Sequence, residues 1–493
     1  MKTAPHDTEA VVVAIDRGSS KPIYRQIYDG YREAILAGRL RPGERLPSTR
    51  SLALELATSR LPVLEAFDQL LAEGYCESRV GAGTFVASSL PDEPKQDPGA
   101  KGPRPGPRRL ARGPASRLRR ASPWLVHTAP FALGGTAVEA FPTDVWARLV
   151  AHHTRRPDRA ALRYGNVMGY PPFREAIADY VRAARAVRCS AAQIMIVAGS
   201  QQALELVARA LVDPGDPVWL EEPGYWGARD VFAMARARAV PVPVDAEGLD
   251  VAAGAVLSPR ARAVYVTPSH QFPLGVTMSA SRRLQLLDWA RRSGAWIVED
   301  DYNSEYRYES QPVGALQGLD RDSRVLYIGT FSKVLAPALR VGYLILPEDL
   351  VERFRLVRWA MDICPPILYQ QALANFLAEG HFARHLRRTR ELYRERRETL
   401  LTALRAEIAA GLPLEIHGEH AGMHVVVTLP AGISDVEVSQ RAAGEGLAAM
   451  PLSNCYFGRR KRAGLLLGYG GTLAEQLPDA VSRLRRAIEP ALG

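Results

Sequence analysis

The sequence predicts a multidomain protein with a small α+β unit at residues 15–88 and a larger α/β unit at residues 124–490. Three observations support this fold class. The chain has 493 residues, about three times the length of a typical domain. Residues 89–123 form a stretch rich in Pro, Gly and basic side chains between the two units. Beyond it, strand-like apolar runs alternate with amphipathic helices, which is typical of a mostly parallel sheet covered by helices on both faces.

Composition excludes several classes of protein. Hydrophobic residues make up 47% and charged residues 24% of the chain, which indicates a globular fold rather than wholesale disorder. No run of about eighteen uncharged apolar residues appears, so neither a membrane-spanning helix nor a membrane partner is expected. The start of the chain carries Asp7, Glu9 and Asp16 and does not resemble a secretory signal, and the four cysteines form no C-x-x-C pair. These features predict a cytoplasmic location.

Most of the net charge of +10 belongs to the linker at 89–123. Between Lys95 and Arg120, nine basic residues stand against Asp97 alone, whereas residues 1–90 hold eleven basic and eleven acidic side chains. Because the linker has almost no apolar residues, it is predicted to stay flexible and solvated. Two interpretations remain open, a plain spacer or a spacer that also contacts a phosphate backbone.

The small unit is predicted to contain three helices and a hairpin. An apolar residue recurs every four positions after Pro22, which indicates a first helix that ends near Gly38. Ser48 is placed to cap a second helix, and a third helix ends at Gly74. Two extended runs then flank the turn 81–83, so the unit is typical of a winged helix-turn-helix. The apolar positions available for packing are Ile23, Ile27, Tyr31, Ile35, Leu52, Leu54, Leu56, Val63, Phe67, Leu70 and Leu71.

The segments "GRLRPGERLPSTRSLALELATSR" and "GAGTFV" resemble the DNA-binding domain of GntR-type transcription regulators. The resemblance implies that the third helix enters the major groove of a double-stranded DNA operator while the hairpin reaches the minor groove. By position, Arg50 and Arg60 would meet phosphates or base edges. Ser59 would cap the third helix, and Gly81 would lie at the wing tip. The dipeptide 61–62, Leu-Pro, departs from the pattern because it offers no hydrogen bond to a base, so DNA shape would carry part of the specificity; a winged helix that only docks proteins remains the alternative.

In the large unit, the informative side chains follow predicted strands. Ser200 and Gln201 join a strand to a helix, where free N–H groups could hold an anion. Carboxylates and a phenol end a second strand at 299–302, and 330–333 ends a third, with Arg340 seven residues after Lys333. Sites in such sheets lie beyond the carboxyl ends of the strands. The predicted strands are Ile194–Val197, Val218–Leu220, Ala263–Val266, Trp296–Val298, Val325–Ile328 and Tyr343–Leu346.

In this order the motifs resemble fold-type I, pyridoxal-phosphate-dependent aminotransferases. With the first unit included, the chain resembles the MocR-type subfamily of GntR regulators. The segments that carry the resemblance are "RYGNVMGYPPFREAI", "IMIVAGSQQALEL", "DPGDPVWLEEPGYWGAR", "VTPSHQFPLGVTM", "VEDDYNSEYRY" and "YIGTFSKVLAPALRVGYL". It implies a large subdomain at about 145–350 and a smaller C-terminal α/β subdomain at about 351–490.

The resemblance also implies pyridoxal 5'-phosphate as the cofactor. Lys333 would form the Schiff base, its amine pKa lowered by a dry, cationic site. Asp300, which fits the family spacing better than Asp301, would keep the pyridine nitrogen protonated. Tyr302 would hydrogen-bond the ring oxygen, and Tyr225 would stack on the ring. The residues that would hold the phosphate are Ser200, Gln201, Thr330 and Arg340, with Tyr164 from a partner subunit.

Two departures from the aminotransferase pattern bear on catalysis. Phe272 stands where many aminotransferases have an Asn that binds the ring oxygen; His270 or Gln271 could substitute. Leu466 stands where they have an arginine that clasps the substrate carboxylate. Arg229 or the basic cluster 459–462 could compensate. The departures predict no net catalysis and favour an effector without an α-carboxylate, or pyridoxal phosphate itself.

The function predicted is that of a DNA-binding transcription regulator that senses a small amine, an amino acid or pyridoxal phosphate. By resemblance it would assemble as a head-to-tail homodimer. The alternatives are an active aminotransferase with an appended DNA-binding domain, and a scaffold that holds no cofactor. No metal site is expected, because the histidine pair 381/385 lacks a carboxylate ligand nearby, and His417, His420 and His424 are expected on the surface.

Overall fold

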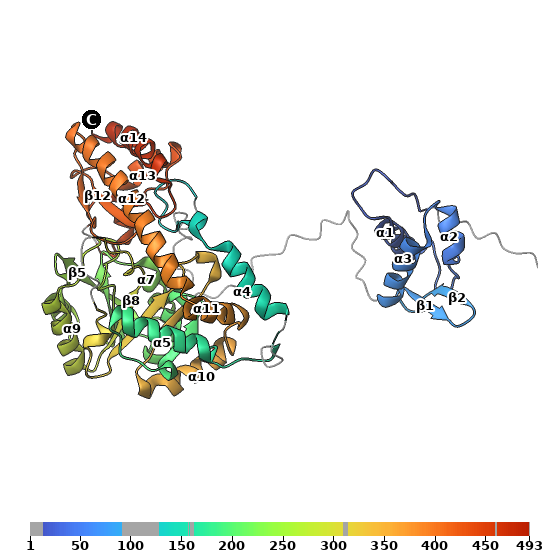
Figure 1. The fold of residues 1–493 in the computed structure, drawn as a ribbon, viewed down its shortest axis with the longest axis horizontal. Helices are drawn as coiled ribbons and strands as arrows, with labels where there is room; N and C mark the ends of the chain where they lie inside the picture. Colours follow the sequence, from blue (N-terminus) through green and yellow to red (C-terminus); the bar gives the residue numbers. More distant parts are fainter. Residues whose placement is uncertain are drawn as a thin grey trace, which may run out of the picture. The chain divides into compact units, whose positions relative to one another are not determined.

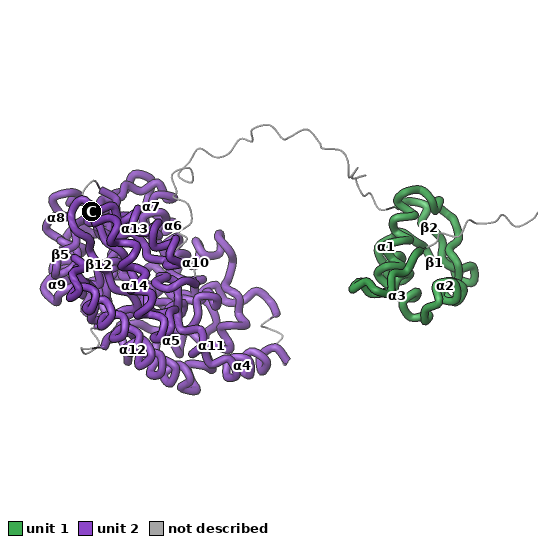
Figure 2. Tube along the Cα trace, turned by 90° about the horizontal axis from the view of Figure 1, so that it is seen from above, with its two compact units in different colours: residues 1–109 green, residues 110–493 purple. Residues whose placement is uncertain are grey.

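A computed structural model of the chain describes residues 13–90, 128–155, 157, 162–308, 314–458 and 461–492. The chain divides into two compact units, residues 1–109 and 110–493, and each is described by itself (Figure 2). Apart from residues 89 and 90, the predicted linker lies outside the described residues, as do Arg459 and Arg460 of the basic cluster.

The first unit has the predicted three helices and hairpin. Its elements are α1 (Ile23–Leu36), α2 (Thr49–Glu55), α3 (Arg60–Ala72) and the antiparallel pair β1 (Cys76–Arg79) and β2 (Gly83–Val86). The buried rings of Tyr31 on α1 and Phe67 on α3 meet edge to face, with centroids 5.5 Å apart. Leu54, expected to pack inward, is 83% exposed, because α2 buries Leu52 and Ala53 instead.

Ser48 caps α2 as predicted, since its Oγ accepts the backbone N–H of Ser51 at 3.0 Å. Replacing Ser48 by Ala is expected to cost about 1 kcal/mol of local stability, which makes hydrogen exchange of the α2 amides about fivefold faster in the full chain. Ser51→Ala is the matched control, because it removes an exposed hydroxyl and keeps the capped N–H. Equal exchange in the two variants would contradict the capping role.

The second unit is built on an eight-stranded sheet with the order β3-β10-β9-β8-β7-β4-β5-β6. The strands are β3 (Ile194–Val197), β4 (Pro217–Glu222), β5 (Arg238–Asp245), β6 (Gly248–Leu249), β7 (Ala263–Val266), β8 (Trp296–Asp301), β9 (Val325–Thr330) and β10 (Gly342–Ile345). The strands from β9 to β5 run parallel, whereas β10 is antiparallel to β3 and β9. The mostly parallel sheet is thus confirmed. The sequence did not indicate β5, whose two prolines are unfavourable in a strand.

Helices cover both faces of this sheet. They are α4 (Thr143–Arg155), α5 (Pro171–Arg185), α6 (Ser200–Leu211), α7 (Trp226–Met234), α8 (Val251–Leu257), α9 (Ala280–Ser293), α10 (Val351–Asp362) and α11 (Leu368–Ala378). Leu326 and Ile328 of β9 cluster with α6, α7 and α10, whereas Tyr327 clusters with α5 and α11. Because alternate side chains enter opposite cores, the central strands are apolar throughout.

A smaller C-terminal α/β subdomain is present, as the predicted fold class has it, but α10 and α11, which lie in the range 351–490 expected for it, contact the helices of the large sheet instead. The elements of this subdomain are α12 (His381–Ala409), β11 (Glu415–His417), β12 (His424–Thr428), α13 (Asp435–Gly444), β13 (Met450–Pro451), β14 (Gly464–Gly468) and α14 (Leu477–Ile488). Figure 1 shows the long α12 leading into the group formed by β12, α13 and α14. The sheet is antiparallel, in the order β11-β12-β14-β13. Val425 and Leu467 belong to the core with these helices, whereas Leu466 belongs to a separate cluster with Phe272.

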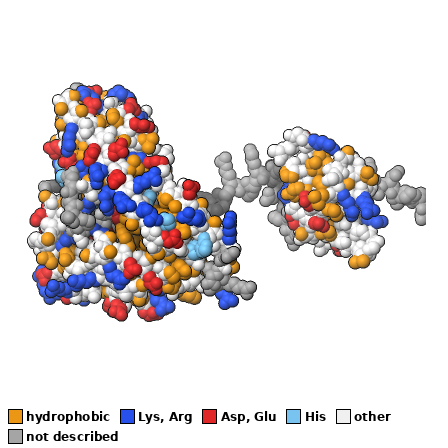
Figure 3. Space-filling view, viewed as in Figure 1, with side chains coloured by type: hydrophobic (Ala, Val, Ile, Leu, Met, Phe, Trp, Pro, Cys, Tyr) orange, Lys and Arg blue, Asp and Glu red, His pale blue; other side chains and the backbone are white. Residues whose placement is uncertain are grey.

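The surface of the second unit carries charges of both signs. On the face seen in Figure 3, basic and acidic side chains are interspersed over the whole unit. Within the residues that the structure describes, no helix has the length and apolar character needed to cross a membrane.

Candidate functional site

A cavity of about 340 Å³ lies at the carboxyl edge of the large sheet. Eight of the nine residues predicted to bind the cofactor line it: Ser200, Gln201, Tyr225, Asp300, Tyr302, Thr330, Lys333 and Arg340. They come together because β3, β4, β8 and β9 end at the same edge, and each of these residues lies at or beyond a strand end.

Lys333 presents a partly buried amine to this cavity. Its Nζ donates a hydrogen bond to the carbonyl oxygen of Leu133 at 3.0 Å. Burial lowers the pKa of the amine to about 8. Desolvation alone accounts for the shift, and the cationic surroundings expected from the sequence do not contribute. A substantial fraction of the amine is therefore neutral near pH 7–8, which makes it a competent nucleophile.

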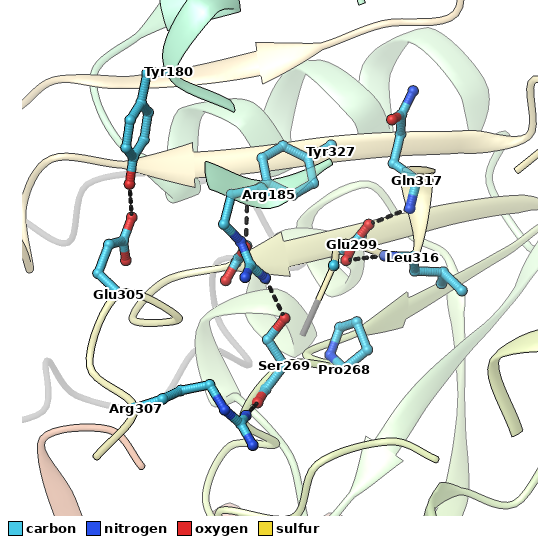
Figure 4. Close-up of polar contacts among 12 residues, drawn as sticks. Tyr180, Arg185, Pro268, Ser269, Glu299, Glu305, Arg307, Leu316, Gln317 and Tyr327 are labelled. Carbon is cyan, nitrogen blue, oxygen red and sulfur yellow. Dashed lines mark hydrogen bonds and ion pairs between the residues drawn. The ribbon is translucent and has the colours of Figure 1, made fainter. Parts of the chain in front are cut away.

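The two carboxylates at the end of β8 have different surroundings. Asp300 Oδ2 accepts the hydroxyl of Tyr265 at 2.8 Å, while its Oδ1 is buried without a hydrogen-bond partner among the described residues. Burial, followed by the neighbouring Asp301, raises the pKa of Asp300 to about 7. Oδ2 of Asp301 instead accepts hydrogen bonds from two residues labelled in Figure 4, Arg185 Nε at 2.8 Å and Tyr327 Oη at 2.7 Å. Its Oδ1 is also buried without a hydrogen-bond partner among the described residues. Because Asp301 does not line the cavity, Asp300 is the carboxylate that presents a free acceptor there.

One end of the cavity is suited to an anion. α6 begins at Ser200, so the unpaired N–H groups of its first turn lie where Ser200 and Gln201 line the cavity. The Arg340 guanidinium reaches the same place, with Nη2 donating to the Ala198 carbonyl at 2.7 Å. Gly199 allows this approach, because its φ is +101° and a Cβ there would lie 3.0 Å from Arg340 Nη2. Thr330 completes this side.

Another part of the cavity lining, the aromatic wall, consists of aromatic side chains. Tyr225, Trp226, Phe272 and Tyr302 line it. Tyr225 Oη accepts a hydrogen bond from Gln201 Nε2 at 2.9 Å, which connects this wall to the start of α6. Leu466 is fully buried behind Phe272 in the middle of β14. The position expected for a carboxylate-binding arginine is therefore part of an apolar cluster.

The residues proposed as substitutes for the missing Asn do not line the cavity. Gln271 Nε2 donates to the carbonyl oxygens of Pro223 and Phe272, at 2.9 and 2.6 Å. His270 contacts the hydroxyl of Tyr302 and the carbonyl of Ala421. Both side chains are thus committed to the protein itself.

The prediction that His424 lies on the surface is wrong. It is 5% exposed, lines the cavity, and pairs its Nε2 with the Pro273 carbonyl oxygen at 2.9 Å. His385 is also buried, with Nε2 bonded to the Val334 carbonyl oxygen at 2.8 Å. No group of three or more His, Cys, Asp or Glu suited to a metal was found in the described parts of the chain.

Other lining residues were missed in the sequence. Thr267 and Asn303 follow β7 and β8, so the rule that located Asp300 would also have found them. Tyr265 lies inside an apolar strand and carries no such signal. Two further lining residues, Ser332 and Pro337, flank Lys333 in the chain, whereas Leu133, Gly134 and Met423 come from distant segments.

The first unit presents the predicted DNA-contacting residues. Arg50 on α2 and Arg60 at the start of α3 are exposed, and Arg60 Nε donates to Thr49 Oγ1 at 3.0 Å. Ser59 occupies the N-cap position of α3, but its side chain makes no capping hydrogen bond. Gly81 has a φ of +75° in the turn between β1 and β2, a conformation that favours glycine.

Comparison with known proteins accounts for both units. The model of the class I and II aminotransferase family matches residues 137–467, and that of the gntR family of bacterial regulatory proteins matches residues 23–86. The chain is 40% identical over 479 residues to the probable rhizopine catabolism regulatory protein MocR of Rhizobium meliloti, covering 97% of this chain and 96% of that protein. The chain belongs to the MocR-type subfamily of GntR regulators.

Other matches of this MocR-type regulator cover either the whole chain or the second unit. The pyridoxine biosynthesis transcriptional regulator PdxR of Corynebacterium glutamicum is 31% identical, over 97% of this chain and 98% of that protein. The α-aminoadipate aminotransferase LysN of Thermus thermophilus, solved with N-(5'-phosphopyridoxyl)-L-leucine, is 31% identical with a TM-score of 0.71. That match covers 77% of this chain and 97% of the aminotransferase.

Two predicted site residues of the MocR-type regulator lie outside the cavity lining. Tyr164 is 80% exposed. Arg229 lies over the ring of Phe457, 4.8 Å from its centroid, and pairs with Asp230 at 3.4 Å. Within this chain, therefore, Arg229 is not placed to meet a ligand in the cavity.

The cavity of the MocR-type regulator fits pyridoxal phosphate. The unpartnered Asp300 Oδ1 is an acceptor for a pyridinium N–H, and the helix terminus with Arg340 is a cradle for a phosphate. The Lys333 amine, with its lowered pKa, suits the aldehyde.

Proposed function

We propose that this MocR-type regulator binds pyridoxal 5'-phosphate at Lys333 and senses a small amine, an amino acid or the cofactor itself. Binding of this effector changes the affinity of the regulator for operator DNA. One observation carries the proposal: an amine with a lowered pKa, an unpartnered carboxylate oxygen and an anion cradle share a single cavity. When bound, the cofactor supplies an aldehyde and an electron-withdrawing ring.

Different side chains of the cavity would bind different parts of the cofactor. Asp300 Oδ1 would accept the ring N–H and thereby keep the ring nitrogen protonated. Tyr225 would cover the ring face, and Tyr302 would lie beside the ring oxygen. An arginine about 4 Å from a phosphate is worth roughly 4 kcal/mol at an effective dielectric near 20, so Arg340 is the main anchor among the phosphate-binding residues. Those residues are Ser200, Gln201, Thr330 and Arg340.

Sensing rather than turnover is favoured by the aromatic wall. An aminotransferase must clasp the carboxylate of its substrate, and Leu466 is buried where an arginine is expected. The test is an absorbance titration of purified protein with a panel of amines and with free pyridoxal phosphate, followed by steady-state assays on the same panel. We expect at least one spectral change without sustained product formation. Turnover comparable to that of ordinary aminotransferases would favour the alternative, an active enzyme with a DNA-binding domain.

Coupling between the two units requires that the effector bind one state better than the other. A coupling free energy of about 1–3 kcal/mol is typical of allosteric coupling between two sites. The exposure of Tyr164 supports a head-to-tail homodimer in which this residue meets the phosphate of the partner subunit. About thirty flexible linker residues would reach roughly 30 Å, enough to let the small unit contact the partner's large unit. The name of the regulator PdxR supports counting the cofactor among the candidate effectors.

Replacing Arg60 by Ala is expected to weaken operator binding and to reduce the salt dependence of log K by about one unit of slope, because one phosphate contact is lost. Affinity is measured over a series of salt concentrations on duplexes that the native protein selects from a random pool. Arg25→Ala is the matched control, because Arg25 is a partly exposed arginine on α1 whose charge Asp29 balances at 3.4 Å. If the salt dependence of log K stays the same in Arg60→Ala, α3 is not the helix that reads the DNA.

A further inference from the structure

A buried histidine lies behind the aromatic wall of the cavity. His270 is 2% exposed, and both of its ring nitrogens are engaged. Nδ1 is 3.0 Å from the hydroxyl of Tyr302, and Nε2 is 2.8 Å from the carbonyl oxygen of Ala421. Burial and the neighbouring His424 lower the pKa of His270 to about 3, so its ring is neutral at physiological pH.

The two contacts of His270 together determine the direction of both hydrogen bonds. A carbonyl oxygen can only accept, so Nε2 carries the single proton of the neutral ring. Nδ1 then has a lone pair and no hydrogen, and the contact with Tyr302 requires the tyrosine hydroxyl to donate. The phenolic proton of Tyr302 is thus directed away from the cavity and toward His270.

We propose that His270 is a positioning residue that takes the phenolic proton of Tyr302, so that Tyr302 meets a ligand in the cavity as a hydrogen-bond acceptor and not as a donor. What this inference says about the cofactor-bound protein rests on the proposed binding of pyridoxal phosphate. It distinguishes this chain from an arrangement in which the tyrosine donates to the ring oxygen of the cofactor.

The residue that stands in place of the expected asparagine supplies no hydrogen-bond donor. Phe272 occupies the position at which an asparagine would supply a second donor to the ring oxygen, and its side chain has no polar atom. The charged or titratable groups around Tyr302 and His270 are Asp300, Glu221, Asp301, His424 and Arg307. The ring oxygen therefore gains no proton from Tyr302 or Phe272, and a ligand group that donates a hydrogen bond fits beside Tyr302.

The test uses the pH at which the visible absorbance of the cofactor-loaded full chain changes by half. A donor on the anionic ring oxygen stabilises its charge and lowers this midpoint, by about one pH unit for a hydrogen bond to a charged group. We expect Tyr302→Phe not to raise the midpoint. We expect His270→Phe to lower it by about one unit, because Tyr302 is released to donate, and the double variant to lose this drop. Tyr306→Phe is the matched control, since it removes a buried tyrosine hydroxyl that bonds to Thr389 outside the cavity.

A rise of about one unit in Tyr302→Phe would overturn the proposal, even if His270→Phe fails to fold. A second measurement needs no cofactor: the ¹⁵N shifts of the His270 ring, assigned by comparison with His270→Phe, should show a protonated Nε2 and a bare Nδ1. The reverse tautomer would overturn the inference and leave the proposed function intact. Conversely, native protein that takes up no pyridoxal phosphate would overturn the proposed function, while the tautomer measurement would still decide the direction of the hydrogen bond.

Discussion

Replacing Lys333 by Ala is expected to abolish the visible absorbance of bound pyridoxal phosphate and the adduct that borohydride fixes. The sequence contains six lysines, and of those that the structure describes only Lys333 lines the cavity. Its partly buried primary amine has a pKa of about 8, which no substitute side chain at this position reproduces. The measurement is the absorbance spectrum of purified protein incubated with excess cofactor, together with the intact mass after borohydride reduction.

Lys333→Arg is the matched control for this prediction. It keeps a cation in the cavity but has no primary amine, so it should retain at most a weak, non-covalent association and give no mass increase after reduction. A fixed adduct in Lys333→Ala that equals the adduct of the native protein would contradict the assignment of this lysine.

Replacing Arg185 by Met is expected to lower the free energy of unfolding of the second unit by about 3–5 kcal/mol, because it leaves the Asp301 charge buried without its partner. The side chains of the pair are 3% and 1% exposed, and Arg185 also donates to Ser269 Oγ at 2.8 Å (Figure 4). Urea denaturation followed by tryptophan fluorescence measures this loss. All seven tryptophans lie at or beyond Trp124, so the signal reports on the second unit.

Two further variants test the origin of this loss. Arg182→Met removes an exposed arginine three residues earlier on α5, where it pairs with Asp179, and should change the stability by less than about 1 kcal/mol. The double variant Arg185→Met/Asp301→Leu should recover most of the loss, since it removes both charges. A double variant as unstable as Arg185→Met would show that lost packing, and not the unpaired charge, is responsible.

Sequence reasoning located the cavity through residues that directly follow strands. Ser200, Asp300 and Lys333 were found in this way, because a strand end is a local feature and parallel strands end at one edge of a sheet. The same reasoning placed His424 on the surface. In the structure His424 is the first residue of β12, a buried strand of the C-terminal sheet. The reasoning also failed for Tyr265 and Leu133, which reach Asp300 and Lys333 from other parts of the chain.

The sequence by itself determined the order of the elements, the two families of motifs and the set of side chains at the strand ends. These depend on periodicity and spacing, which are properties of neighbouring residues. Only the tertiary structure decided that Asp300 presents a free oxygen to the cavity while Asp301 pairs with Arg185 outside the cavity lining, and that His270 receives the proton of Tyr302. Burial and hydrogen-bond direction depend on groups far apart in the chain, as His270 and Ala421 are, 151 residues from each other. Spacing in the sequence carries no information about such contacts.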